Sequence, residues 1–115
     1  MQKKESIEKL SEKIKRKKFG RLTDINGIKR KFEVGRFVTQ RASEYRDKVF
    51  ILEEISTPWR KTVKKKGLKL FRLGYYIIGK KPKTKGKWVW GQYAPFITDR
   101  DLKELIKNAE KEGIL

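Results

Sequence analysis

Between positions 59 and 90, aromatic rings occur among many basic side chains. The candidate basic site residues are Arg60, Lys61, Lys64, Lys65, Lys66, Lys80, Lys81, Lys83, Lys85 and Lys87. The candidate aromatic residues are Trp59, Tyr75, Tyr76, Trp88 and Trp90. Lysines on loops are suited to contacts with backbone phosphates, and aromatic rings can stack on unpaired bases. The pattern predicts a nucleic-acid-binding surface.

The distribution of charge along the chain points in the same direction. The 115 residues include 32 Lys and Arg and 14 acids, a net charge of +18. Residues 55–98 contain 12 basic side chains and no Asp or Glu. Self-repulsion in such a segment costs stability unless an anionic partner, or acids from elsewhere in the chain, offset it. We therefore expect much of the basic surface to remain unneutralised after folding.

Two residue types are missing, and their absence excludes several kinds of chemistry. The chain has no Cys and no His. Disulfides, zinc fingers, thiol nucleophiles and His-based acid–base catalysis are therefore excluded. The glycine-bounded loop 79–86 is not a Walker A motif either. A P-loop has Ser or Thr after its Gly-Lys pair, whereas Gly86-Lys87 is followed by Trp88. No cofactor is expected.

Acidic residues leave one enzymatic alternative, a metal-dependent nuclease. Such an enzyme needs carboxylates that converge on one point. The acids at the start of the C-terminal helix are explained by capping and by the helix dipole. A cluster of Asp24, Glu33 and Glu53, assembled by the fold, remains open. We expect a binding protein without catalytic residues, and a nuclease is the less favoured reading.

The helices and strands that the sequence pattern predicts belong to the α+β class. They are an antiparallel sheet of about five strands, a C-terminal helix packed on one face and a short basic N-terminal helix. The strands are expected at 19–25, 28–38, 49–56, 68–78 and 87–94. Asn26-Gly27 predicts a hairpin turn, and Gly35 and Gly74 are candidate bulges. Thr98 is the expected N-cap of the last helix, and Gly113 its C-terminal stop.

The N-terminal segment, residues 1–18, is predicted to be a basic helix or arm that precedes a single domain at 19–115. Ile7, Leu10 and Ile14 form a narrow apolar stripe, so this helix should dock lightly or become ordered with a partner. It ends in the run Lys15, Arg16, Lys17 and Lys18, a second candidate phosphate-binding patch.

Strand alternation places Trp88 and Trp90 on one face of the last strand and Val89, Gly91 and Tyr93 on the other. If the C-terminal helix covers the Val89 face, both Trp rings lie open beside the basic loops and can stack on bases, with Tyr76 behind them. If it covers the Trp face, the rings belong to the core. The alternation does not decide between these arrangements.

A membrane and an acidic protein are the alternatives to nucleic acid as a partner. The N-terminal stripe has no Trp or Phe to anchor it in lipid, so no membrane partner is expected. An acidic protein or ribonucleoprotein partner remains the alternative to direct binding of DNA or RNA. Arg60 and Arg72 are the only arginines in the acid-free segment. This favours recognition of backbone or shape over base readout.

Composition also bears on location. A Cys-free chain whose N-terminus, MQKKESIEKL, lacks an apolar signal-like region is expected in the cytoplasm. Abundant Lys, Glu and Ile is typical of thermophilic proteins. The choice of DNA or RNA, the strandedness of the ligand and the oligomeric state stay open.

Overall fold

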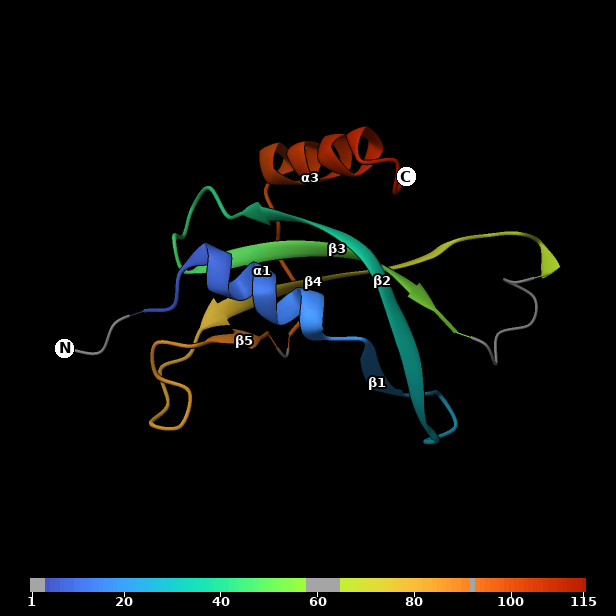
Figure 1. Cartoon of the computed structure of the whole chain (residues 1–115), viewed down its shortest axis with the longest axis horizontal. Coiled ribbons are helices and arrows are strands. Elements are labelled where there is room, and N and C mark those ends of the chain that lie inside the picture. Colours follow the sequence, from blue (N-terminus) through green and yellow to red (C-terminus); the bar gives the residue numbers. More distant parts are fainter. Residues whose placement is uncertain (1–3, 58–64, 92) are drawn as a thin grey trace.

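The computed structural model describes residues 4–57, 65–91 and 93–115, and its elements are labelled in Figure 1. Five antiparallel strands form one sheet in the order β1-β2-β3-β4-β5. They are β1 (Phe19–Thr23), β2 (Lys29–Arg41), β3 (Lys48–Ser56), β4 (Leu70–Ile78) and β5 (Trp88–Trp90). Helix α1 (Ile7–Arg16) and helix α3 (Asp99–Lys111) lie on opposite faces of this curled sheet. The predicted α+β class is confirmed.

The central strand of the sheet is β3, whose apolar run is buried on both faces. Phe50 and Leu52 belong to the cluster under α3, whereas Val49 and Ile51 belong to the cluster under α1. Its register with β4 is continuous, so the bulge suggested at Gly74 is wrong. Glycine is needed there for another reason: a Cβ at this position would come 2.2 Å from the Trp90 ring.

The β1–β2 hairpin forms where Asn-Gly predicted it, with a longer loop than a two-residue turn. The Asp24 N–H donates to the Ile28 carbonyl at 2.9 Å, and this leaves three residues in the loop. Of these only Gly27 has a positive φ, +79°. The predicted bulge at Gly35 is confirmed, because the β2–β3 register shifts between Val34 and Phe37.

Helix α3 has both predicted caps. Thr98 Oγ1 accepts a hydrogen bond from the Asp101 N–H at 3.1 Å. At the other end Gly113 has φ +74°, and the Ile114 N–H donates to the Ala109 carbonyl at 2.9 Å. This is the Schellman arrangement, and it returns Ile114 to the core. The helix packs on β2 and β3.

Helix α1 is packed more firmly than its narrow stripe suggested. Ser6 caps it, and Leu10 and Ile14 are buried against the sheet. The sheet side of this cluster consists of Val49, Ile51, Tyr76, Ile78 and Trp88. Burying each of the two aliphatic side chains contributes about 1.5–3 kcal/mol relative to exposure. Among the described residues, no helix is long and apolar enough to cross a membrane.

Candidate nucleic-acid interface

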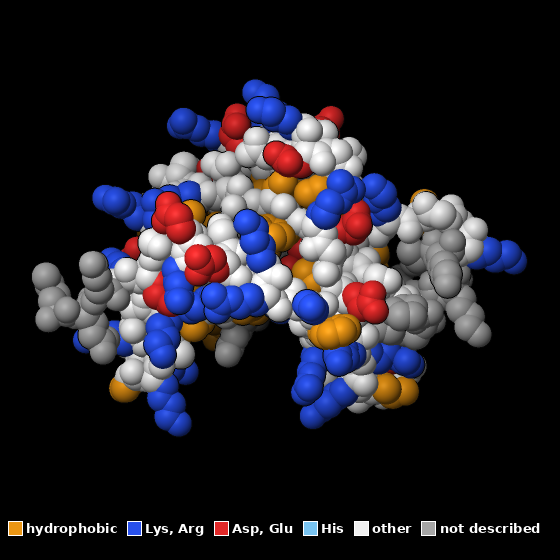
Figure 2. Space-filling model, in the orientation of Figure 1, with side chains coloured by type: hydrophobic (Ala, Val, Ile, Leu, Met, Phe, Trp, Pro, Cys, Tyr) orange, Lys and Arg blue, Asp and Glu red, His pale blue; other side chains and the backbone are white. Residues whose placement is uncertain are grey.

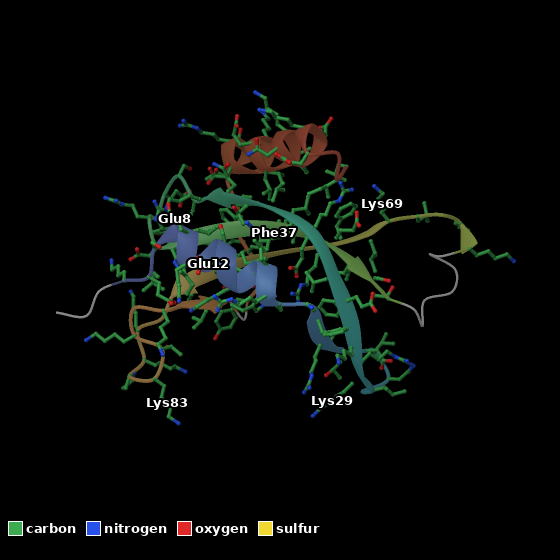
Figure 3. All side chains as sticks on the ribbon, in the orientation of Figure 1. Glu8, Glu12, Lys29, Phe37, Lys69 and Lys83 are labelled. Carbon is green, nitrogen blue, oxygen red and sulfur yellow. The ribbon has the colours of Figure 1, made fainter. Side chains whose placement is uncertain are left out.

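The lysine-rich segment after β4 is a hydrogen-bonded loop, which we call the basic loop (residues 79–87). The Gly79 N–H donates to the Lys87 carbonyl at 2.8 Å, and the Gly86 N–H donates back to Gly79 at 3.1 Å. The loop projects from the sheet at the lower left of Figure 1. In Figure 3 the labelled Lys83 side chain points away from the protein.

The basic loop brings five predicted site residues together. They are Lys80, Lys81, Lys83, Lys85 and Lys87, and all are exposed. Within the described ranges, none of their ammonium groups forms an ion pair, and the six ion pairs found there join other cations to other carboxylates. Figure 2 shows Lys and Arg side chains extending from this loop and, across the hollow at the bottom of the view, from the β1–β2 hairpin.

The predicted basic residues Lys65 and Lys66 lie apart from this loop. Lys65 and Lys66 are exposed before the start of β4, whereas the basic loop follows its end. A strand of nine residues separates them by about 30 Å. The two groups are therefore not one patch. Arg60, Lys61 and Lys64 lie outside the described residues.

The patch at the end of α1 is smaller than predicted. Lys15, Arg16 and Lys18 are exposed, and Arg16 pairs with Glu12 at 3.8 Å. Lys17 instead turns inward, with its Nζ 4.8 Å from the centre of the Trp90 ring. Burial lowers the pKa of Lys17, and the charge of Arg72 adds to this shift. Lys17 is therefore not placed to meet a phosphate.

The prediction that Trp88 stacks on bases requires an open ring, and the structure buries this ring under α1. Its side chain is only 4% exposed. The indole Nε1 donates to the carbonyls of Glu5 and Ser6, both at 3.0 Å. Tyr76 is buried in the same cluster, where loss of solvent and the Glu53 carboxylate raise its pKa to about 12. Neither ring can stack on a base in this arrangement.

Trp90 is half-buried on the same face and is held from several sides. Tyr76 packs edge-on against it, with ring centres 5.2 Å apart. The guanidinium carbon of Arg72 lies 4.1 Å from the ring centre. Arg72 Nε donates to Glu53 at 2.6 Å, and the Glu53 side chain is 0% exposed. The ring and this ion pair stabilise the sheet face under α1.

The fold separates the three acids that a metal site would have required. Asp24 pairs with Arg30 at 2.7 Å near the hairpin turn. Glu33 is registered opposite Ser56, which alternation places on the other face of β3 from Glu53. Among the described residues there is no group of three acidic, His or Cys side chains that could hold a metal ion.

On the face opposite α1, the β4–β5 end of the sheet carries a groove of about 890 Å³. Helix α3 lies on this face but packs over β2 and β3. The residues lining the groove include Tyr75, Ile77 and Val89 from the sheet, and Trp90 borders it at the edge strand β5. Tyr45 and Tyr93 line it from the flanking segments and are 61% and 81% exposed. Its basic residues are Arg46, Lys48, Lys80 and Lys81.

Glycine at position 91 shapes this groove. A Cβ there would come 2.0 Å from Cε2 of Tyr75, so only glycine lets the Tyr75 ring lie across the end of β5. Lys48 lies over the same ring, with its Nζ 4.9 Å from the ring centre. The Tyr75 ring is only 8% exposed, so it supports the groove from below, with a cation beside it.

Asp101 holds the segment that carries Tyr45. Its carboxylate accepts hydrogen bonds from the Ser43 N–H at 2.9 Å and from the Ser43 hydroxyl at 3.1 Å. Burial acts to raise the pKa of Asp101, but the hydrogen bonds from Ser43 and Thr98 outweigh it, and the pKa falls below its usual 3.8. The contact therefore stabilises the fold above that pH and is lost as the pH falls through the lowered pKa.

Replacing Asp101 by alanine should lower the free energy of unfolding by about 1.5–3 kcal/mol at neutral pH, because charged hydrogen bonds are lost and the Ser43 N–H is left without its acceptor. Urea titrations at neutral and acidic pH would measure this. The difference from wild type should shrink below pH 3.8, the ordinary value for this group. Glu104→Ala, at an exposed acid in the middle of the same helix, is the control. A difference that stays constant in acid would contradict the role of the carboxylate.

Sequence reasoning identified the groove lysines Lys80 and Lys81 but missed Tyr45 and Tyr93. Tyr45 lies in a polar stretch without periodicity, and alternation left open whether the face of Val89 and Tyr93 is core or exposed. The alternation of side chains along β5 was the available signal, since it separates Val89 from the Trp rings.

No family model matches the chain, and comparison with curated proteins and with solved structures finds no significant match.

Proposed function

We propose that the protein binds nucleic acid by contacts between the basic loop and backbone phosphates, and that it does so without catalysing a reaction. One observation carries the proposal: five exposed lysines of an ordered loop have no ion-pair partner among the described residues. Such a cluster costs stability through self-repulsion unless an anion offsets it. A polyphosphate offers the repeated negative charge that this cluster lacks.

The residue types and spacing of this surface favour contacts that do not depend on the base sequence of the nucleic acid. Lysine ammonium groups act as point charges and do not provide the bidentate geometry with which arginine reads guanine. Lys15 and Lys18 supply a second basic group at the far end of α1. The ten-residue helix places this group about 15 Å from the end near the basic loop. One nucleic-acid strand that follows α1 would reach both groups.

Fluorescence anisotropy with labelled single-stranded DNA, duplex DNA and RNA would test the proposal. At about 0.1 M salt we expect a dissociation constant of roughly 10⁻⁶ M or tighter for at least one polymer, the tight end of non-specific binding. Polyglutamate of equal total charge, added as competitor, should displace the labelled nucleic acid poorly. Weak binding to every polymer would overturn the proposal in favour of docking to an acidic protein. Displacement by polyglutamate as effective as by unlabelled nucleic acid would do the same.

A further inference from the structure

We infer that the groove over β4 and β5 holds unpaired bases, so that the nucleic acid bound is single-stranded. The inference rests on the proposed function and adds the strandedness of the ligand and the site of its bases. It places the bases on the face opposite the one that carries Trp88 and Trp90.

Apolar and aromatic groups are exposed in this groove although two helices were available to cover the sheet. Ile77, near the end of β4, is 37% exposed and lies beside half-buried Val89. Tyr45 and Tyr93 are each more than half exposed. Exposed apolar surface within a concave site marks a ligand-binding groove more often than a solvated face. Flat rings that flank an apolar floor suit a ligand that is itself flat and aromatic.

Charge around the groove indicates that this aromatic ligand carries phosphates. Its four basic side chains face two acids, Glu44 and Asp47. Asp47 already accepts a hydrogen bond from Lys4 Nζ at 2.7 Å. Lys80 and Lys81 belong both to the groove and to the basic loop, so the proposed phosphate contacts continue directly into the groove. A nucleic-acid strand supplies rings and phosphates in this order, whereas an acidic peptide supplies charge with few rings.

A double helix does not fit this combination. In a duplex the faces of the bases are stacked on one another, so its phosphates could reach the basic loop while its rings could not reach Ile77 or Val89. A single strand can turn its bases outward and stack them on aromatic side chains while the backbone follows the lysines. Because stacking does not depend on base identity, we expect little sequence preference.

The test compares three labelled ligands of equal length at fixed salt. They are oligothymidylate, an abasic strand with the same number of phosphates but no bases, and a duplex. We expect wild-type protein to bind oligothymidylate at least about fivefold more tightly than the abasic strand, since each stacked base contributes a factor of about 5 to 150. Tyr45→Ala combined with Tyr93→Ala should remove most of this advantage and leave binding to the abasic strand unchanged.

Two matched variants serve as controls. Tyr45→Phe combined with Tyr93→Phe keeps both rings and should keep the preference for oligothymidylate. Phe19→Ala removes an exposed ring from β1, at the opposite edge of the sheet, and should not alter the preference. The altered tyrosines are largely exposed, so the melting temperature should hold.

Equal wild-type affinity for oligothymidylate and for the abasic strand would overturn the groove inference while leaving nucleic-acid binding intact. A preference that survives in the double alanine variant would do the same. Tighter binding to the duplex would also overturn it. Failure to bind any of the three ligands would overturn the proposed function together with the inference.

Discussion

Replacing Trp88 by alanine is expected to lower the free energy of unfolding by about 3–5 kcal/mol, because a large buried ring is removed from the cluster under α1. The substitution also removes the indole donor that the carbonyls of Glu5 and Ser6 accept. These carbonyls lie at the start of α1, so the helix should lose its attachment to the sheet before the rest of the chain unfolds. Urea unfolding followed by far-ultraviolet circular dichroism would measure both effects.

Trp88→Phe separates packing from hydrogen bonding, and it keeps the prediction testable should the alanine variant fail to fold. It retains an apolar ring and loses the donor, so we expect a smaller loss of about 1–3 kcal/mol. Phe96→Ala, at a largely exposed position, should change stability by less than about 0.5 kcal/mol. A Trp88→Ala protein of unchanged stability with weakened single-strand binding would mean that the ring is open and that α1 does not cover it.

The second large effect concerns the basic loop. Changing Lys81, Lys83 and Lys85 together to alanine should lower nucleic-acid affinity about 100-fold at about 0.1 M salt, if each ammonium neutralises one phosphate. The dependence of log affinity on log salt should become shallower by about 2 units for a single strand. The melting temperature should not fall, since these side chains are exposed and carry no ion pair among the described residues.

Helix α3 offers a control with the same change in net charge. Lys103, Lys107 and Lys111 are exposed on a helix that packs on β2 and β3, away from the basic loop. Their replacement by alanine should weaken binding by less than about tenfold, because it alters only the long-range field, which salt screens within about 10 Å. Equal losses from the two triple variants would mean that binding follows net charge and that the basic loop has no special part in it.

The elements of this fold that sequence predicted well are those with local signals. Thr98 and Gly113 mark the ends of α3 by capping chemistry, which depends on a few adjacent residues. The hairpin at Asn26-Gly27 likewise depends on a local feature, the positive φ of Gly27, and the bulge at Gly35 was indicated by a glycine inside a strand. The apolar run of β3 identified the central strand, because only a strand buried on both faces has no polar alternation.

The assignment of helices to sheet faces was not predictable in the same way. Alternation correctly placed Trp88 and Trp90 together, but the face that each helix covers depends on contacts between distant segments. Three apolar residues on α1 seemed too few for firm packing. Leu10 and Ile14 are nevertheless buried, because Trp88 and neighbouring strand residues supply most of the apolar surface of that cluster.

Contacts between distant segments also determine which aromatic residues form the candidate site. The sheet face that carries Trp88 is core, and the Val89 face, whose covering alternation left undecided, carries the open groove. Tyr45 reaches this groove because Asp101 on α3 holds Ser43 through the hydrogen bonds described above. Ser43 and Asp101 lie 58 residues apart, so no local pattern relates them.

The salt dependence of binding tests the central claim most directly. Anisotropy titrations of wild-type protein with the preferred polymer would be run from about 50 to 200 mM salt. If the five lysines of the basic loop each displace a counterion from a single strand, the slope of log affinity against log salt should be about −3.5 and affinity should fall about 100-fold over this range. A slope shallower than about −1 would contradict the account, because so few released counterions would leave the basic loop without phosphate contacts.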